Sequence, residues 1–174
     1  MKKRYLQQNV YQALLERLHF IFHEFDVVYV SFSGGKDSGL LLYILLDFRD
    51  KFYPSTSIGV FHQDFEAQYR ATTEYVEETF RMLEKRPGVE LYWLCLPMAT
   101  RTALSSFEMY WYPWDDKKET LWVRPMPEYD YVINLKNNPV TTYHYKMHQE
   151  DLAKQFGRWY RSVCLLYTSD AADD

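Results

Sequence analysis

The chain has 174 residues, of which 47% are apolar and 18% aromatic, so it can bury one core and is too apolar to be disordered. Its 20 basic and 24 acidic residues give a net charge of −4, and we therefore expect no nucleic-acid partner. The longest apolar run, Leu40–Leu46, is too short to cross a membrane, and no apolar segment follows the basic N-terminus. These features predict a cytoplasmic protein with no membrane partner.

Helices and strands are predicted to alternate over the first half of the chain. Amphipathic spacing indicates helices, and short β-branched or aromatic runs indicate strands. In chain order we expect a helix over Tyr5–Phe25, a strand over Val27–Phe32, a helix around Leu40–Leu46 buried between layers, a strand over Thr56–Phe61, a helix over Glu66–Lys85 with Tyr69 on its inner face, and a strand over Val89–Leu96. This order predicts an α/β fold of three layers around a parallel central sheet.

The regular alternation ends at Pro97, and turn residues dominate up to a final helix predicted over Gln149–Tyr160. Open parallel sheets usually have about four to six strands, and only three are predicted, so we expect the fold to be incomplete at its C-terminal end. One domain is expected over residues 1–161. The end of the chain, Ser162–Asp174, resembles translated sequencing-adapter sequence, and we expect a non-native or disordered tail there.

A glycine cluster marks the passage from the first strand to the second helix. Three of the six glycines lie between positions 34 and 39. Glycine lets main-chain amides approach a ligand closely, and a helix N-terminus adds unpaired N–H groups that attract an anion. The alternative is an ordinary turn capped by a single Ser or Asp. The residues predicted to hold a phosphate group are Ser31, Ser33, Gly34, Gly35, Lys36, Asp37 and Ser38.

The segment Ser33–Ser38, with the sequence SGGKDS, is neither a Walker A loop nor a GxGxxG motif, because Asp follows the lysine and the glycines are adjacent. It resembles the loop of the PP-loop (ATP pyrophosphatase) superfamily, which has an adenine nucleotide alpha hydrolase-like fold. Within that superfamily the chain is most similar to the phosphoadenosine phosphosulfate (PAPS) reductase-like family. More narrowly, it resembles reductase-like proteins described as prophage gene co-activators. The stretches His62–Tyr69 and Trp122–Glu128 extend this resemblance, which covers residues 5–161.

The resemblance implies that the loop binds an adenine nucleotide, ATP or phosphoadenylylsulfate, together with Mg²⁺. Lys36 and Asp37 would then be catalytic, in an adenylyl transfer that releases pyrophosphate to an acceptor that the sequence does not identify. One alternative is a non-catalytic nucleotide-binding transcriptional co-activator that acts through a protein partner. Another is a PAPS reductase or sulfotransferase, although the late cysteine, Cys164, lacks the neighbours that reductases of this family have.

Two further residues complete the predicted nucleotide site. Asp64 follows the second strand, where it can accept a ribose hydroxyl or hold Mg²⁺ through water, unless it only caps the next helix. Arg124 follows the aromatic segment Phe107–Trp122 and is predicted to clamp a phosphate or sulfate group. The aromatic segment itself either stacks a base beside that clamp or forms a lid on the core. No metal site is predicted: His19 and His23 have a metal-pair spacing but no third ligand.

Overall fold

The computed structural model describes the main chain of residues 7–170 and the side chains of residues 7–162. Helices and strands alternate up to residue 94, and short elements follow. The elements are α1 (Val10–Glu24), β1 (Val28–Ser31), α2 (Lys36–Phe52), β2 (Ile58–Gln63), α3 (Arg70–Leu83), β3 (Val89–Leu94), β4 (Thr100–Arg101), β5 (Tyr110–Trp111), the 3₁₀ helix η1 (Asp116–Leu121), β6 (Val132–Ile133) and α4 (Gln149–Asp170).

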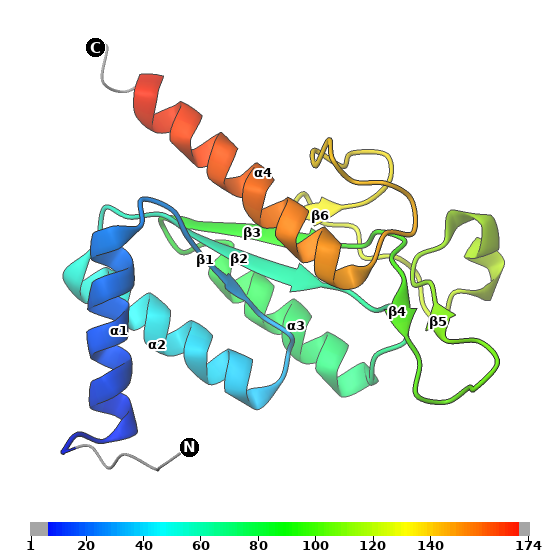
Figure 1. The fold of residues 1–174 in the computed structure, drawn as a ribbon, viewed down its shortest axis with the longest axis horizontal. Helices are drawn as coiled ribbons and strands as arrows, with labels where there is room; N and C mark the ends of the chain where they lie inside the picture. The colour runs from blue at the N-terminus through cyan, green and yellow to red at the C-terminus, as the bar shows by residue number, and fades with distance from the viewer. Residues whose placement is uncertain (1–6, 171–174) are drawn as a thin grey trace.

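The main sheet has four parallel strands in the order β1-β2-β3-β6. Helices α2 and α3 cover one face, α1 packs against α2, and α4 crosses the other face (Figure 1). Each face has its own buried cluster: Val60, Phe80 and Trp93 belong to the one under α2 and α3, and Phe61 and Phe156 to the one under α4. The predicted three-layer α/β architecture with a parallel sheet is therefore confirmed.

The fourth strand, β6, was not among the predicted strands. Its two residues pair with the end of β3, Val132 opposite Trp93 and Ile133 opposite Leu94. Two residues are too few to show a period in the sequence. The strand exists because the chain returns to the sheet after a long excursion, and both of its side chains become buried there.

The sequence analysis was wrong about the burial of two features. The helix expected to be buried on all sides, α2, has Leu40 and Leu41 exposed to 62% and 40%, because only one of its faces packs on the sheet. Tyr69, predicted on the inner face of the next helix, is 87% exposed, because α3 begins at Arg70 and not at the predicted Glu66, which leaves Tyr69 just before the helix. Buried residues such as Val76 and Leu83 do form the predicted inner face of α3.

The last helix, α4, begins at the predicted residue, Gln149, but continues to Asp170 instead of ending at Tyr160. Residues 162–170 of the expected tail are thus helical, while residues 171–174 lie outside the described part of the chain. That this segment is foreign to the natural protein remains a prediction. Within residues 7–170 no helix has both the length and the apolar character needed to span a membrane.

Candidate functional site

The candidate site lies at the carboxyl end of the parallel sheet, where open α/β sheets bind their ligands. The segment between β1 and α2 is there, and the segments that follow β2, β3 and β6 gather at the same edge (Figure 1). The predicted site residues fall into two groups. One is the loop from Ser31 to Ser38, and the other is a buried cluster around Asp64 and Arg124.

The conformation of the loop depends on glycine at one position. Gly34 has φ +80°, and a Cβ atom built there would lie 2.7 Å from Val76 and 2.9 Å from Thr72 on α3. Gly35 differs, because its φ is −83° and the nearest atom to a Cβ would be Ser33 Oγ at 3.4 Å. Position 34 therefore requires glycine for the fold, whereas position 35 has room for a side chain.

Two serine side chains brace the loop from within. Ser33 Oγ and Ser38 Oγ lie 2.9 Å apart, and the Ser33 main-chain N–H donates to Ser38 Oγ at 3.2 Å. Ser38 Oγ lies 2.9 Å from the Gly35 carbonyl, and the Gly35 N–H donates to Ser33 Oγ at 3.3 Å. These serines hold the bend in shape, which is a structural role beyond the ligand contact predicted for them.

The rest of the loop leaves donors unpaired. Within the described residues, the main-chain N–H groups of Gly34, Lys36, Asp37 and Ser38 donate no hydrogen bond. The side chains of Lys36 and Asp37 are exposed and, in the same part of the chain, have no hydrogen bond or ion pair. Ser31, at the end of β1, is exposed as well. The arrangement offers a positive, donor-rich corner to an anion.

Asp64 has a different environment from the one predicted. Its side chain is fully buried, and both carboxylate oxygens lie 2.6 Å from Arg124 Nη2. Oδ2 also accepts the indole N–H of Trp93 at 2.6 Å, and Oδ1 accepts the main-chain N–H of Glu66 at 2.7 Å. With both oxygens engaged inside the protein, a ribose hydroxyl or a hydrated Mg²⁺ reaches Asp64 only if one of these contacts breaks.

Arg124 is bound within the same cluster and not at the loop. Its Nε donates to the Glu66 carbonyl at 3.0 Å, and its guanidinium lies 4.9 Å from the Trp114 ring centroid. Among the described residues, no hydrogen bond or ion pair joins it to the segment 33–38. Because a buried carboxylate neutralises its charge, Arg124 is poorly suited to the phosphate-clamping role predicted for it.

Glu66 is a site residue that the sequence analysis did not single out. It is 4% exposed and has φ +60°, an unusual conformation for a residue with a side chain. Its two carboxylate oxygens accept the main-chain N–H groups of Trp114 and Val123, at 2.8 and 3.0 Å. Glu66 thereby fixes both ends of the segment 114–123 to the turn after β2. The available signals were its position two residues after Asp64 and its place in the stretch His62–Tyr69.

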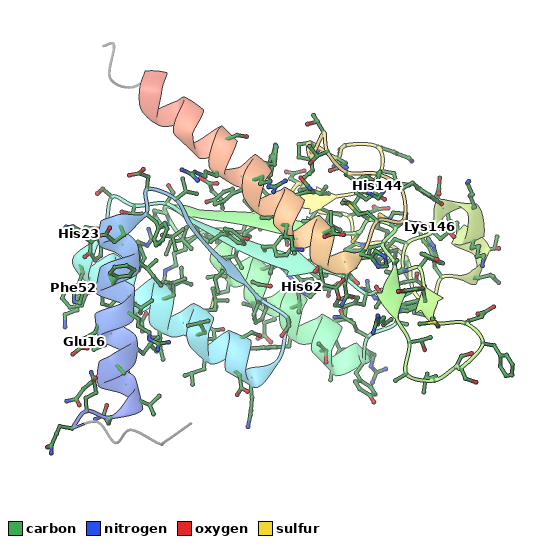
Figure 2. The ribbon with its side chains drawn as sticks, in the orientation of Figure 1. Glu16, His23, Phe52, His62, His144 and Lys146 are labelled. Atoms are coloured by element: carbon green, nitrogen blue, oxygen red, sulfur yellow. The ribbon has the colours of Figure 1, made fainter. Side chains whose placement is uncertain are left out.

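Two more buried polar groups surround this cluster. His62 lies on the side of the sheet that α3 covers (Figure 2), and its Nδ1 lies 2.7 Å from the Phe32 carbonyl at the end of β1. Burial lowers the pKa of His62, which keeps the ring neutral with Nδ1 as the donor. Burial and the nearby Asp64 carboxylate raise the pKa of Cys95, so the buried thiol predicted from the sequence stays protonated.

The sequence left two interpretations open for the aromatic segment Phe107–Trp122: a surface that stacks a base, or a lid on the core. One part of the segment fits the lid, and another part is exposed. Trp114 is 1% exposed and packs edge-on against Trp122 at 5.1 Å, as expected for a lid on the core. Phe107, in contrast, is 97% exposed. The segment therefore places Trp114 in the interior, leaves Trp111 and Trp122 half-buried and leaves its outer loop in solvent.

The described residues contain no group of three or more His, Cys, Asp or Glu side chains that could hold a metal ion. His19 packs edge-on against Phe48 at 4.6 Å, and His23 contacts Glu24 at 2.9 Å. These contacts account for the histidine spacing in α1. The side chain of Cys164 lies outside the described residues.

Comparison with known proteins finds a relative in Escherichia coli. The chain is 36% identical over 123 residues to the uncharacterized protein YbdN of Escherichia coli strain K12. The match covers 71% of this chain and 29% of the relative, so the chain spans less than a third of that protein's length. No protein-family model matches the chain, and no solved structure matches it.

Proposed function

We propose that the chain is an adenine-nucleotide-binding domain of the PP-loop type, and that the segment Ser33–Ser38 holds the phosphates of ATP or phosphoadenylylsulfate. The observation that supports this is the set of unpaired main-chain N–H groups at the exposed N-terminus of α2, beside Lys36. Hydrogen bonds to a charged group contribute about 1.5–3 kcal/mol each, so three or four of them bind a polyphosphate usefully.

The proposed reaction is adenylyl transfer with release of pyrophosphate. An oxygen of the acceptor attacks the α-phosphorus, its bond to phosphorus forms as the bond to the pyrophosphate oxygen breaks, and the electron pair leaves with pyrophosphate. The loop amides and Lys36 stabilise the charge that develops on this leaving group. Positioning and charge stabilisation are sufficient for such a step, and no side chain of the chain acts as a nucleophile.

Mg²⁺ fits this proposal through the chemistry of its ligands. The ion is usually bound by one or two carboxylates together with phosphate oxygens and water. Asp37, exposed in the first turn of α2 and free of partners among the described residues, provides such a carboxylate. Bound there, the ion would neutralise charge on the nucleotide phosphates.

We do not extend the proposal to sulfur reduction. Reduction by a cysteine needs an accessible thiolate. Cys95, the only cysteine whose side chain the structure describes, is fully buried, and its pKa is raised by that burial.

The test of binding is the substitution Gly35→Val. A Cβ atom at this position would meet only Ser33 Oγ, at 3.4 Å, so we expect the fold to be preserved while the valine side chain occupies the space proposed for the phosphates. We expect the calorimetric affinity for ATP or phosphoadenylylsulfate to fall by more than about tenfold, equivalent to about 1.4 kcal/mol. Gly35→Ala, with a single methyl group, is the matched control and should lose less. Equal nucleotide affinity in wild type and Gly35→Val would refute the proposal.

The catalytic part is tested separately from binding. Pyrophosphate release from radiolabelled ATP is measured across candidate acceptors, for wild type and for Asp37→Asn. Turnover that depends on Asp37 supports the enzyme. Nucleotide binding without turnover under any of these conditions supports a sensor or co-activator that keeps the same binding site.

A further inference from the structure

A second cavity lies at the carboxyl ends of β3 and β6, separate from the loop after β1. It has a volume of about 790 Å³ and is lined mainly by the segment from Trp122 to Asn137. Cavities that bind small molecules usually measure about 300–1,000 Å³. The size is therefore that of a small-molecule site, and the nucleotide proposal makes no use of it.

Three aromatic side chains, Trp114, Trp122 and Tyr129, line part of this cavity and are held in place by packing. Trp122 contacts Trp114 edge-on at 5.1 Å, and its indole N–H donates to the Asp115 carbonyl at 3.1 Å. Tyr129 stacks on Tyr131 at 5.1 Å with an interplanar angle of 13°. The rings are thus fixed before any ligand enters, and their faces carry the negative charge that attracts cations.

The charged groups that line the cavity are mostly acidic. Glu119, Glu128 and Asp130 have no ion pair or side-chain hydrogen bond to any described residue, and Asp116 accepts only the Tyr145 hydroxyl. The basic side chains are Lys136 and Arg124, and the latter is already neutralised by the buried Asp64. The balance of free charge is negative, so the cavity disfavours a phosphate or sulfate group.

We propose that this cavity binds a small organic cation, a primary amine or guanidinium attached to an apolar body. The apolar part would pack against Trp122, Met126 and Tyr129, and the charged group would face the carboxylates of Glu119 and Glu128. This combination binds cations because ring faces and carboxylates together replace the water that the ammonium loses. The inference does not depend on the nucleotide site.

The chain itself contains an ammonium group in a similar setting close by. Lys146 Nζ lies 4.4 Å from the Tyr112 ring centroid and 2.7 Å from an Asp115 oxygen. Asp115 is buried, and its pKa is lowered, although burial alone opposes this, because Lys146 and the Tyr145 hydroxyl bond to it. Ring faces and carboxylates therefore already hold one cation at this end of the molecule, at the opposite end from Glu16 (Figure 2).

The test uses three probes of one shape and different charge: phenethylamine, 2-phenylethanol and hydrocinnamate. Binding is followed by tryptophan fluorescence and calorimetry on the full chain at low salt. We expect phenethylamine to bind, the neutral alcohol to bind about tenfold or more weakly, and the carboxylate not to bind. Affinity for the amine should fall as salt is added, because the rim carboxylates are exposed.

The variant Glu119→Gln/Glu128→Gln removes two rim charges and keeps the shape of both side chains. We expect it to weaken phenethylamine binding about tenfold, with unchanged unfolding by urea. Glu16→Gln, an exposed glutamate on α1, is the matched control and should change nothing. Gly35→Val should bind the amine normally even when it has lost the nucleotide, which separates the two proposals.

Three outcomes would overturn the inference. They are no binding of phenethylamine at millimolar concentration, equal binding of the neutral alcohol, and an amine affinity that the double variant leaves unchanged.

Discussion

The loop from Ser33 to Ser38 and the cluster around Asp64 lie at the same edge of the sheet. They differ in whether their polar groups are hydrogen-bonded within the protein. The loop is exposed and leaves main-chain donors and two charged side chains without partners among the described residues. In the cluster, Asp64 is completely buried, and its carboxylate accepts from Arg124, Trp93 and Glu66.

This difference separates a binding role from a structural one. A buried charge without partners costs several kcal/mol, so the groups around Asp64 are matched to one another and hold the segment 114–124 against the sheet. Exposed donors cost little when unpaired, because water satisfies them until a ligand arrives. Substitutions in the cluster should therefore change stability, and substitutions in the loop should change binding.

The largest expected effect is that of Asp64→Ala. The substitution leaves Arg124 Nη2 and the Trp93 indole N–H without their acceptor inside the protein and removes the carboxylate that neutralises the guanidinium. We expect the free energy of unfolding, measured with urea, to fall by about 3–5 kcal/mol. Asp151→Ala, which removes an exposed ion pair to Lys154, is the control and should cost less than about 1 kcal/mol. Similar losses in the two variants would show that the cluster is not structural.

The second test compares the effects on stability of substituting two adjacent glycines of the loop, Gly34 and Gly35. In Gly34→Ala, the new methyl group meets Val76 and Thr72 on α3, and the positive φ is strained for any side chain. We expect a loss of about 2–4 kcal/mol in the free energy of unfolding. Gly35→Ala, at ordinary dihedral angles with open space, should change it by less than about 1 kcal/mol. If the two variants unfold alike, α3 does not pack on the loop as described.

The loop was predictable from the sequence because its donors are consecutive residues at a strand-to-helix passage. The strand, the glycines and the first turn of α2 all lie between Val28 and Gly39. What local pattern could not supply is the reason for Gly34, because Val76 and Thr72 meet it only after α3 packs across the bend.

For the cluster around Asp64, the sequence indicated two of the residues but not the contacts between them. Asp64 and Arg124 were both singled out, but their contact joins residues 60 positions apart and depends on the path of an irregular segment. Such a segment has no period from which its path can be inferred. The sequence therefore favoured two ligand-binding residues where the structure has one internal ion pair, and it gave no indication of the bonds to Glu66.

The third test concerns the pH dependence of stability. Burial lowers the pKa of His62 in the folded state below the ordinary histidine value of 6.5. The unfolded chain then binds the proton more readily, so the contribution of neutral His62 is complete above pH 6.5 and is lost as the pH falls below it. The slope contributed by one such group is at most about 1.4 kcal/mol per pH unit. His62→Gln should lose that part of the slope between pH 6.5 and pH 5 in urea unfolding, and an unchanged slope would contradict the assignment.

The smallest expected effect on stability is that of Lys36→Ala. Its side chain is exposed and makes no hydrogen bond or ion pair with a described residue, so the free energy of unfolding should change by less than about 0.5 kcal/mol. Affinity for ATP, measured by calorimetry, should nevertheless fall by about tenfold, because one charge-assisted contact to phosphate is removed. Lys51→Ala, an exposed lysine at the other end of the same helix, is the matched control for charge alone. If Lys36→Ala lowers the free energy of unfolding and leaves the affinity for ATP unchanged, the loop is a structural turn. The loop and the Asp64 cluster would then both have structural roles.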